Sequence, residues 1–289
     1  MMNRRRFLVI SACALAAPAH AGTVAEWQGT GFGAALSLRL VGADPVRARR
    51  IFGKVATQVE RIEAAFSLHR DSALTRLNRD GRLAWPSEEM RAVLDLCGRV
   101  HAATAGAFDP TVQPLWRAEA EGGDIDLARR AIGWPRVKVT AAEVRLAPGQ
   151  ALTFNGIAQG WAADRIATLL RSEGYGNALI DMGEVQALGH RADRTDWIAT
   201  IAGPSGHPLA TARLTNRALA TSSPRGTLIG GRPHILGPAG QEPLWSTVSV
   251  SAPNASVADA LSTAFCLMDR PAMDRALASF PDARIEIVV

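Results

Sequence analysis

The chain has 289 residues, of which 47% are hydrophobic, and its formal net charge is +5. No run of basic residues is interleaved with aromatic ones, so nucleic-acid binding has no support, and no cluster of Cys and His has zinc spacing. The length fits one large domain or two closely packed halves. Cys97 and Cys266 are too few and too far apart for a disulfide framework. Because both lie in hydrophobic stretches we expect them to be buried, with pairing left open.

The first 21 residues have the pattern of an export signal. Arg4, Arg5 and Arg6 precede a short apolar run from Phe7, and a small-residue cleavage site ends at Ala21. The Arg-Arg-x-Phe-Leu order is that of the twin-arginine type, with an ordinary secretory signal as the alternative. The apolar run is shorter than the roughly 20 residues that span a bilayer. We therefore predict a twin-arginine-type signal peptide at 1–21, a single domain at 22–289, a periplasmic location and no stable membrane insertion.

Hydrophobic periodicity predicts the main elements of the domain in chain order. The apolar spacing and helix-start signals predict helices at 45–66, 87–97, 126–132, 157–173, 257–268 and 271–280. Alternating or continuous apolar runs predict strands at 35–40, 137–146, 151–154, 178–188, 197–201, 210–214, 247–251 and 284–289. Helices and strands mix without a regular βαβ rhythm, which predicts an α+β fold rather than a doubly wound one.

Two polar segments stand out in the first half of the domain. Residues 66–78 read as a helix end that leads into a polar loop, and a solvated loop accounts for them. Residues 104–112 place Asp109 before a proline, which favours an extended or turn conformation. A turn aspartate accounts equally well for that pattern. Neither segment identifies a function when taken alone.

A third segment, TFNGIAQGWAAD at 153–164, joins an apolar run to a helix through two glycines. Free backbone N–H groups at a helix start attract anions, and Gly156 and Gly160 would let the backbone approach a phosphate. A tight turn explains the same glycines. No GxxxxGK[ST] sequence occurs, and the glycines of 29–33 lead into a strand, so neither a P-loop nor a dinucleotide fingerprint is present.

A fourth segment carries Asp259 and Thr263 four residues apart on a predicted helix, where they share one face. A carboxylate and a hydroxyl offer hard oxygen ligands of the kind that Mg²⁺ takes beside phosphate oxygens and water. Simple capping of the helix start is the alternative. The pair therefore predicts a magnesium site only in combination with the other segments.

Taken in order, the polar segments resemble one family, the FAD:protein FMN transferases or ApbE family. The resemblance runs from about Gly33 to Met268 and rests on the blocks SLHRDSALTRLN, TAGAFDPTVQPLW, FNGIAQGWAADRIATLL, ALIDMGEVQALG, RALATS, HILGPAG and VADALSTAF. The export signal is similar to that of the exported, NosX-like branch of the family. The resemblance implies an α+β fold with mixed, largely antiparallel sheets and packed helices, similar to a T-fold.

The resemblance also implies a reaction and its residues. FAD is the donor, Mg²⁺ assists, FMN passes to a threonine hydroxyl of an acceptor flavoprotein such as a respiratory-complex subunit, and AMP leaves. By motif match, the side chains of Asp259 and Thr263 and the carbonyl of Ala158 would bind Mg²⁺, and His234 would be the general base. The residues matched to FAD contacts are Asn155, Trp161, Ala107, Phe108 and Asp109, with His69 where the family often has an aromatic residue.

The chain departs from the family pattern at several of these positions. Phe32-Gly33-Ala34 replaces a Met-Gly-Thr start, and Gln159 stands where many members have Lys. Gly237 and Ala239 replace the usual Asp and Arg or Lys after His234. If that missing Asp orients the histidine, turnover would be slow. The alternatives are an FAD-binding carrier or assembly factor and an FAD pyrophosphatase with weak transferase activity.

Overall fold

The computed structural model describes residues 23–289, and the predicted export signal lies outside them. Its centre is a seven-stranded sheet in which every hydrogen-bonded neighbour is antiparallel. The strands lie in the order β1 (Val24–Gly31), β2 (Ala34–Val41), β6 (Ala178–Asp181), β7 (Val185–Leu188), β10 (Ala218–Ser222), β13 (Val248–Ala252) and β14 (Arg284–Val288). The predicted α+β class with largely antiparallel sheets is confirmed.

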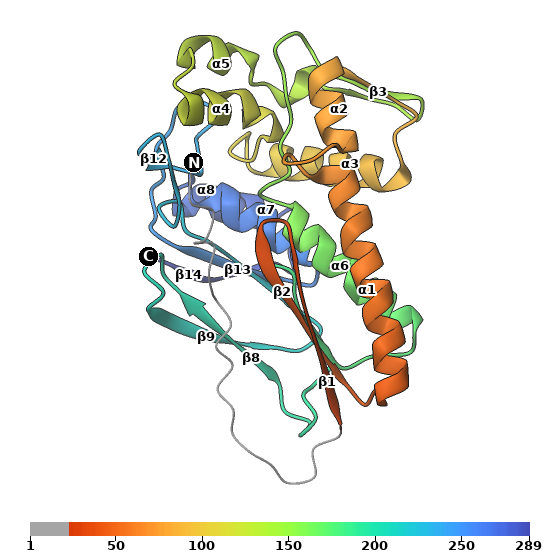
Figure 1. Cartoon of the computed structure of the whole chain (residues 1–289). Coiled ribbons are helices and arrows are strands. Elements are labelled where there is room, and N and C mark those ends of the chain that lie inside the picture. Colours follow the sequence, from red (N-terminus) through yellow and green to blue (C-terminus); the bar gives the residue numbers. More distant parts are fainter. Residues whose placement is uncertain (1–22) are drawn as a thin grey trace.

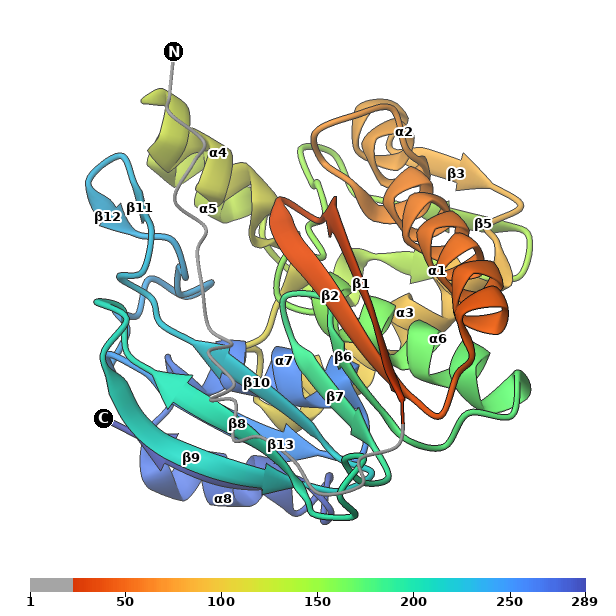
Figure 2. The same cartoon turned by 60° about the horizontal axis from the view of Figure 1, so that its bottom comes forward.

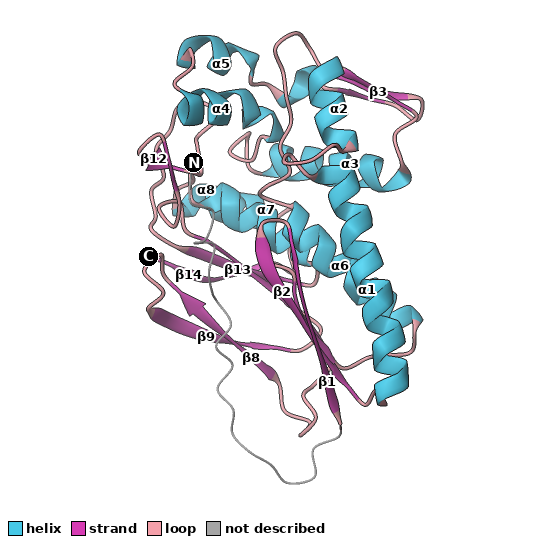
Figure 3. Cartoon of the chain, in the orientation of Figure 1, coloured by secondary structure: helices cyan, strands magenta, loops and turns pink. Residues whose placement is uncertain are grey.

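One face of this sheet is covered by helices (Figures 1 and 3). These are α1 (Pro45–Phe66), α3 (Glu88–Ala103), α6 (Ala158–Ser172), α7 (Ala255–Phe265) and α8 (Arg270–Leu277). The helix α1 begins where Asp44 accepts hydrogen bonds from the N–H groups of Val46 and Arg47, and Pro45 occupies its first turn. Its buried stripe, which includes Ile51 and Val55, packs into the main core with the inward side chains of β2.

The opposite face of the sheet is covered by a hairpin (Figure 2). Strands β8 (Trp197–Ala202) and β9 (Pro208–Leu214) form a separate two-stranded sheet. Trp197 and Ile201 of the hairpin pack on Leu179, Val185 and Leu219 of the large sheet, which makes a second, smaller core. The large sheet is therefore buried on both faces at its centre, which explains why successive residues of β6 and β7 are buried.

The remaining elements gather at the end of the molecule shown at the top of Figure 1. They are α2 (Ala73–Asp80), α4 (Gln113–Glu121), α5 (Ile125–Ala131), the 3₁₀ turns at Pro110–Val112 and Trp134–Arg136, and the short strands β3 (Arg82–Ala84), β4 (Lys138–Val139) and β5 (Glu143–Arg145). A further hairpin of β11 (Leu228–Ile229) and β12 (Arg232–Pro233) precedes His234. Within residues 23–289, no helix is long and apolar enough to cross a membrane.

Several predicted elements differ from the structure. Residues 137–146 form two short strands around a turn rather than one, and 178–188 divide at the turn 182–184 into β6 and β7. Residues 73–80 form a helix, not a loop, because Ser72 and Thr75 make a capping box at its start.

Residues 151–154 are extended but form no strand. The side chain of Asn78 replaces a neighbouring strand there: Leu152 N–H donates to Asn78 Oδ1 (2.7 Å) and Asn78 Nδ2 donates to the Leu152 carbonyl (2.8 Å). A side-chain amide offers one donor and one acceptor, the same pair that a strand residue would present.

Cys97 and Cys266 are buried and unpaired. Their predicted burial is confirmed, and the question of a disulfide between them is answered in the negative. Burial raises the pKa of both thiols well above the usual value for cysteine. Both side chains are therefore protonated, unreactive parts of the core.

Candidate functional site

The site begins at the turn that leads into α6. Phe154 is buried, and its ring packs edge-on against Phe66 at 5.1 Å between centroids. The Phe154 carbonyl accepts hydrogen bonds from Ile157 (2.9 Å) and Ala158 (2.8 Å), which closes the first turn. Asn155 and Gly156 project from this turn, and Asn155 is exposed. The turn is thus anchored by an aromatic core residue and presents its polar tip to solvent.

The second glycine serves helix packing. A Cβ at Gly160 would overlap the backbone carbonyl of Ala255 at the start of α7. The Gly160 N–H donates to Asp259 Oδ2 at 3.0 Å. Gly160 therefore lets α6 and α7 approach closely at the carboxylate, and its N–H is already used by Asp259 and not offered to a phosphate.

The first glycine packs closely against a hydroxyl. A Cβ at Gly156 would lie 3.0 Å from Thr263 Oγ1. That hydroxyl also lies 3.4 Å from Ser222 Oγ at the end of β10. Asp259 and Thr263 thus both face the start of α6, as expected from their spacing. The carbonyl of Ala158, in the first turn of α6, belongs to the same region.

A second, half-buried carboxylate interacts with Asp259. Glu184 lies in the turn between β6 and β7, and its Oε2 accepts a hydrogen bond from Thr221 N–H at 3.2 Å. Burial raises its pKa well above the usual value, and the charges of Asp259 and Asp181 raise it further. Burial likewise raises the pKa of Asp259 to about 7; the Gly160 N–H opposes this shift, and the charge of Asp164 adds to it.

These carboxylates lack a basic partner. Among residues 23–289, no Lys, Arg or His forms an ion pair with Asp259 or Glu184. Asp259 Oδ1 receives no hydrogen bond from the described residues. Buried like charges without a counterion are unfavourable, so this location favours a cation or a proton.

The donor set fits magnesium better than a metal held by protein alone. In the described part of the chain, no group of three or more His, Cys, Asp or Glu side chains is arranged to hold a metal. One carboxylate, one hydroxyl and a backbone carbonyl are hard oxygen donors, and Mg²⁺ commonly takes few protein ligands and completes its shell with phosphate and water.

His234 is fixed by backbone carbonyls. Its Nδ1 lies 2.9 Å from the carbonyl of Pro224 and 3.3 Å from that of Thr227. Since carbonyls only accept, Nδ1 carries the proton and Nε2 is left as the acceptor. Burial lowers the pKa of His234, with both carbonyls opposing the shift. At neutral pH the ring is therefore uncharged, as a general base requires.

The loop after His234 accommodates its unusual sequence. A Cβ at Gly237 would collide with the backbone and side chain of Gln241. Gln241 Oε1 accepts a hydrogen bond from Ala239 N–H at 2.9 Å. The amide of Gln241 thus occupies the space beside Gly237 and shapes the loop. Although this position has no aspartate, the carbonyls of Pro224 and Thr227 still orient His234.

Both carboxylate oxygens of Asp109 accept hydrogen bonds from the protein, one from its own loop and one from Trp134. Oδ1 accepts from the Thr111 N–H (2.8 Å) and hydroxyl (2.5 Å), and Oδ2 accepts from Trp134 N–H (3.2 Å). The adjacent Pro110 carbonyl accepts from Thr153 N–H at 2.8 Å. Asp109 therefore organises the loop that contains the buried Ala107 and Phe108, and the loop is joined to the strand-like segment before α6.

Two predicted FAD contacts lie apart from the carboxylates. The indole N–H of Trp161 donates to Glu89 of α3 (3.1 Å), and its ring packs near Phe66. Gly160 and Asp164 face α7, so Trp161 occupies another side of α6. His69 is exposed in the loop between α1 and α2. Their contacts with FAD remain predictions, as does that of Asn155.

Sequence reasoning missed Glu184, Asp164 and Ser222. Glu184 lies in an Asp-Met-Gly-Glu sequence inside a stretch that was read as one continuous strand, and recognition of a turn there would have exposed it. Asp164 is an acidic residue on an otherwise apolar helix face, which is itself a signal for a buried partner. Ser222 has no distinguishing pattern of its own.

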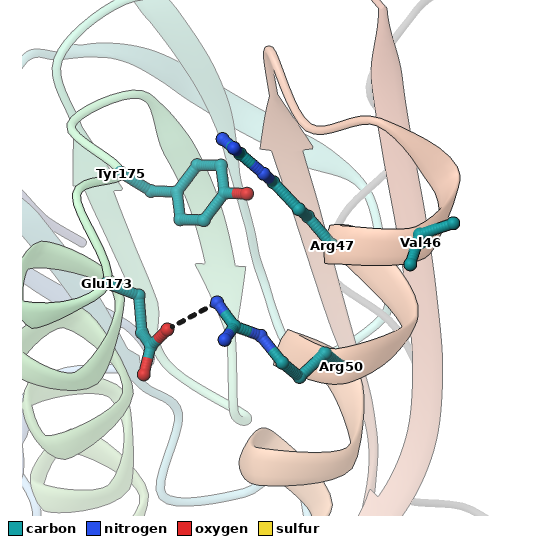
Figure 4. A pocket seen from close by; sticks show the side chains of 5 residues that line it. All are labelled: Val46, Arg47, Arg50, Glu173 and Tyr175. Atoms are coloured by element: carbon teal, nitrogen blue, oxygen red, sulfur yellow. Dashed lines mark hydrogen bonds and ion pairs between the residues drawn. The ribbon is translucent and has the colours of Figure 1, made fainter.

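A separate hollow of about 380 Å³ lies at the other end of α6 (Figure 4). It is lined by Val46, Arg47, Arg50, Glu173 and Tyr175. Glu173 forms ion pairs there with Arg50 (3.0 Å) and with Lys54. The acid in this hollow is already paired, unlike those at the start of α6.

Comparison with known proteins gives a consistent result. The sequence pattern described as the ApbE family matches residues 32–288. A protein of Salmonella typhimurium named FAD:protein FMN transferase is 28% identical over 271 residues, covering 83% of this chain and 77% of its own. A protein of the same name from Escherichia coli is 26% identical, with coverage of 87% and 80%.

Solved structures share the fold. The ApbE protein of Thermotoga maritima superposes with a TM-score of 0.79 at 24% identity, covering 92% of this chain and 94% of its own. The flavin transferase ApbE of Vibrio cholerae gives a TM-score of 0.77 at 22% identity, with coverage of 89% and 91%. At these identities the superpositions establish the architecture alone.

Proposed function

The chain belongs to the ApbE family, and from this premise we propose that it is an FAD:protein FMN transferase. FAD is the donor substrate, and a threonine hydroxyl of another protein is the acceptor. In the proposed step a bond forms between the threonine oxygen and the phosphorus of the FMN moiety. The bond from that phosphorus to the bridging pyrophosphate oxygen breaks, AMP leaves, and the threonine proton passes to the enzyme.

Mg²⁺ would be held by Asp259, Thr263 and the Ala158 carbonyl. When bound, it supplies positive charge to the phosphate oxygens during phosphoryl-type transfer. Asp259 offers its free Oδ1 while Oδ2 stays bound to Gly160 N–H. The protein residues contribute position: α7 presents carboxylate and hydroxyl one turn apart, and Gly156 packs against Thr263, where a larger residue would press on the hydroxyl.

His234 would accept the proton of the acceptor threonine at Nε2. The Pro224 carbonyl fixes the tautomer in which this nitrogen is unprotonated. The lowered pKa of the ring keeps it uncharged at neutral pH. Pro224 lies two residues after Ser222, whose hydroxyl contacts Thr263. The end of β10 therefore links the base to the residues that would bind the metal.

One observation carries the proposal: within the matched family segment, the buried carboxylate of Asp259, with Oδ1 free, shares a helix face with the Thr263 hydroxyl, which packs against the glycine turn before α6. Glu184 adds a second acidic group whose ionised form a cation would stabilise. The unprotonated Nε2 of His234 would serve a transferase or a hydrolase, and the family match favours transfer. Exported location and a respiratory acceptor are further parts of this proposal, supported by the arginine pair of the N-terminal sequence.

The test is incubation of the purified protein with FAD, Mg²⁺ and the flavoproteins encoded beside its gene. Covalent flavin fluorescence on an acceptor in a denaturing gel supports the transferase. FMN and AMP without labelling would identify a pyrophosphatase, and intact bound FAD would identify a carrier. His234→Ala should retain FAD binding and lower the transfer rate by about 10²–10⁴-fold, the usual contribution of a general base. An undiminished rate would contradict the role of His234.

A further inference from the structure

The helices α6 and α7 both begin without a side-chain cap of their own. Ile157 precedes α6 and has no polar side chain, and the side chain of Asn254 makes no capping bond at the start of α7. The first N–H groups of a helix have no partner within it. Where such groups are buried, an unmet hydrogen bond is costly, so the acceptors must come from elsewhere.

Each helix receives its acceptor from the other. Asp164 of α6 accepts hydrogen bonds from the N–H groups of Ala255 (2.8 Å) and Ser256 (3.0 Å) and from the Ser256 hydroxyl (2.5 Å). Asp259 of α7 accepts from Gly160 N–H at the start of α6. Both carboxylates are buried, with 8% and 3% of their surface exposed. The two helices therefore cap each other.

We propose that Asp164 is a positioning residue for the transfer reaction. It holds the first turn of α7 against α6, and Asp259 and Thr263 follow one and two turns further along α7. Their placement beside Gly160 and Gly156 thus depends on the bond between Asp164 and the α7 start. The part of the inference that concerns Mg²⁺ rests on the proposed function, whereas the bond between the helices does not.

A capping residue on α7 itself would not hold α7 against α6. An acceptor at position 254 would satisfy the free N–H groups but would not connect α7 to α6. The connection matters because the helices are in near contact at Gly160, where even a Cβ would overlap Ala255. Residues that orient metal ligands typically change metal affinity by about 10–100-fold when altered.

Three variants separate positioning from simple capping. Asp164→Asn keeps one acceptor oxygen and removes the other. Asp164→Asn combined with Asn254→Asp restores a capping carboxylate on α7 alone. Asp269→Asn is the matched control, because Asp269 caps α8 by accepting from Ala272 N–H (2.8 Å) in an exposed position.

The readouts are the thermal midpoint, the hydrogen-exchange rate of Gly160 N–H, and the Mg²⁺ concentration for half-maximal FAD binding measured by flavin fluorescence. Asp164→Asn should lower the midpoint, accelerate exchange at Gly160, and raise the Mg²⁺ requirement about 10-fold or more. The double variant should recover the thermal midpoint of the wild type, but the exchange rate at Gly160 and the Mg²⁺ requirement should stay altered. Asp269→Asn should affect only the midpoint.

Unchanged Gly160 exchange in Asp164→Asn, or full recovery of all three readouts in the double variant, would overturn the inference. If Asp164→Asn does not fold, Ser256→Ala removes one of the three bonds and should shift exchange and Mg²⁺ requirement in the same direction; no shift would count against the inference. If the wild-type protein shows no Mg²⁺-dependent FAD binding, the proposed function fails, and Gly160 exchange still tests the bond between the helices.

Discussion

The two ends of α6 hold their acidic residues in opposite electrostatic states. Past the C-terminal end, Glu173 forms ion pairs with Arg50 (Figure 4) and with Lys54, and the hydrogen bond from Lys54 lowers its pKa. At the N-terminal end, Asp259 and Glu184 face each other with no basic partner among the described residues, and burial raises the pKa of both.

A hollow of about 380 Å³ lies at the end with the paired acid. Its volume alone would therefore point to the wrong end of the helix. The uncompensated charge and the free Asp259 oxygen point to the other end, because they leave an interaction for a ligand to complete. Each prediction below contrasts the two ends or tests what makes the N-terminal end different.

The largest effect should follow from Asp259→Asn. The amide oxygen can still accept from Gly160 N–H, so the helix contact is retained while the metal-binding charge is lost. We expect the transfer rate to fall by about 10²–10³-fold or more, as when charge stabilisation of the transition state is removed. The measurement is the rate of acceptor labelling at saturating FAD.

The matched control for Asp259→Asn is Glu173→Gln, the same loss of one charge at the other end of α6. Its labelling rate should equal that of the wild type. An equal loss of labelling rate in Asp259→Asn and Glu173→Gln would show that the charge at either end of α6 matters only for folding. An active Asp259→Asn variant would refute the metal assignment.

Next in size is the effect of Gly160→Ala on stability. The added Cβ would overlap the carbonyl of Ala255, and overpacking of this kind typically costs about 1–3 kcal/mol of the free energy of unfolding. Gly53→Ala, within α1 and with nothing near its Cβ position, should instead stabilise by about 0.5–1 kcal/mol. Urea unfolding of both variants measures the difference in their free energies of unfolding. A destabilisation of similar size in both variants would contradict the close contact between α6 and α7.

A smaller effect is expected of pH on the Mg²⁺ requirement and on stability. The pKa of Asp259 is raised to about 7, so protons compete with Mg²⁺ for this carboxylate. The Mg²⁺ concentration for half-maximal FAD binding should rise as pH falls from 8 to 6. Because the folded chain holds a proton that the unfolded chain has lost, stability without Mg²⁺ should fall as pH rises from about 4 to 7. An Mg²⁺ requirement equal at pH 6 and pH 8 would be evidence against proton competition.

The smallest effect is that of Glu173→Gln on stability. The ion pairs of Glu173 join partly exposed side chains, and such pairs contribute little. We expect a fall in the thermal midpoint that shrinks further in high salt. A large, salt-independent loss would mean that the C-terminal end of α6 is more than a solvated ion-pair cluster.

The same contrast explains what could be predicted from the sequence. Periodicity was sufficient for α1, since its apolar stripe and its Asp-Pro start are local signals. It failed at residues 151–154, where the hydrogen-bond partner is a side chain 74 positions away. It also failed at the turn of Glu184, because the apolar residues on both sides of the turn belong to two adjacent strands and were read as one.

The candidate site divides in the same way. Asp259 and Thr263 could be found because their spacing on one helix places them on one face. Asp164 and Glu184 were missed, because their partners come from other elements of the fold and their local signals do not name those partners. The sequence left Gly160 open between a phosphate contact and a tight turn and did not predict its role in helix packing, since a sequence does not reveal what lies against a glycine.

The most direct test of the account is mass spectrometry of a candidate acceptor after incubation with the wild-type protein, FAD and Mg²⁺. The account predicts FMN linked through its phosphate to an acceptor threonine, with one AMP released for each FMN attached, and no labelling when Mg²⁺ is chelated. Cleavage of FAD to FMN and AMP with no modified threonine would contradict it.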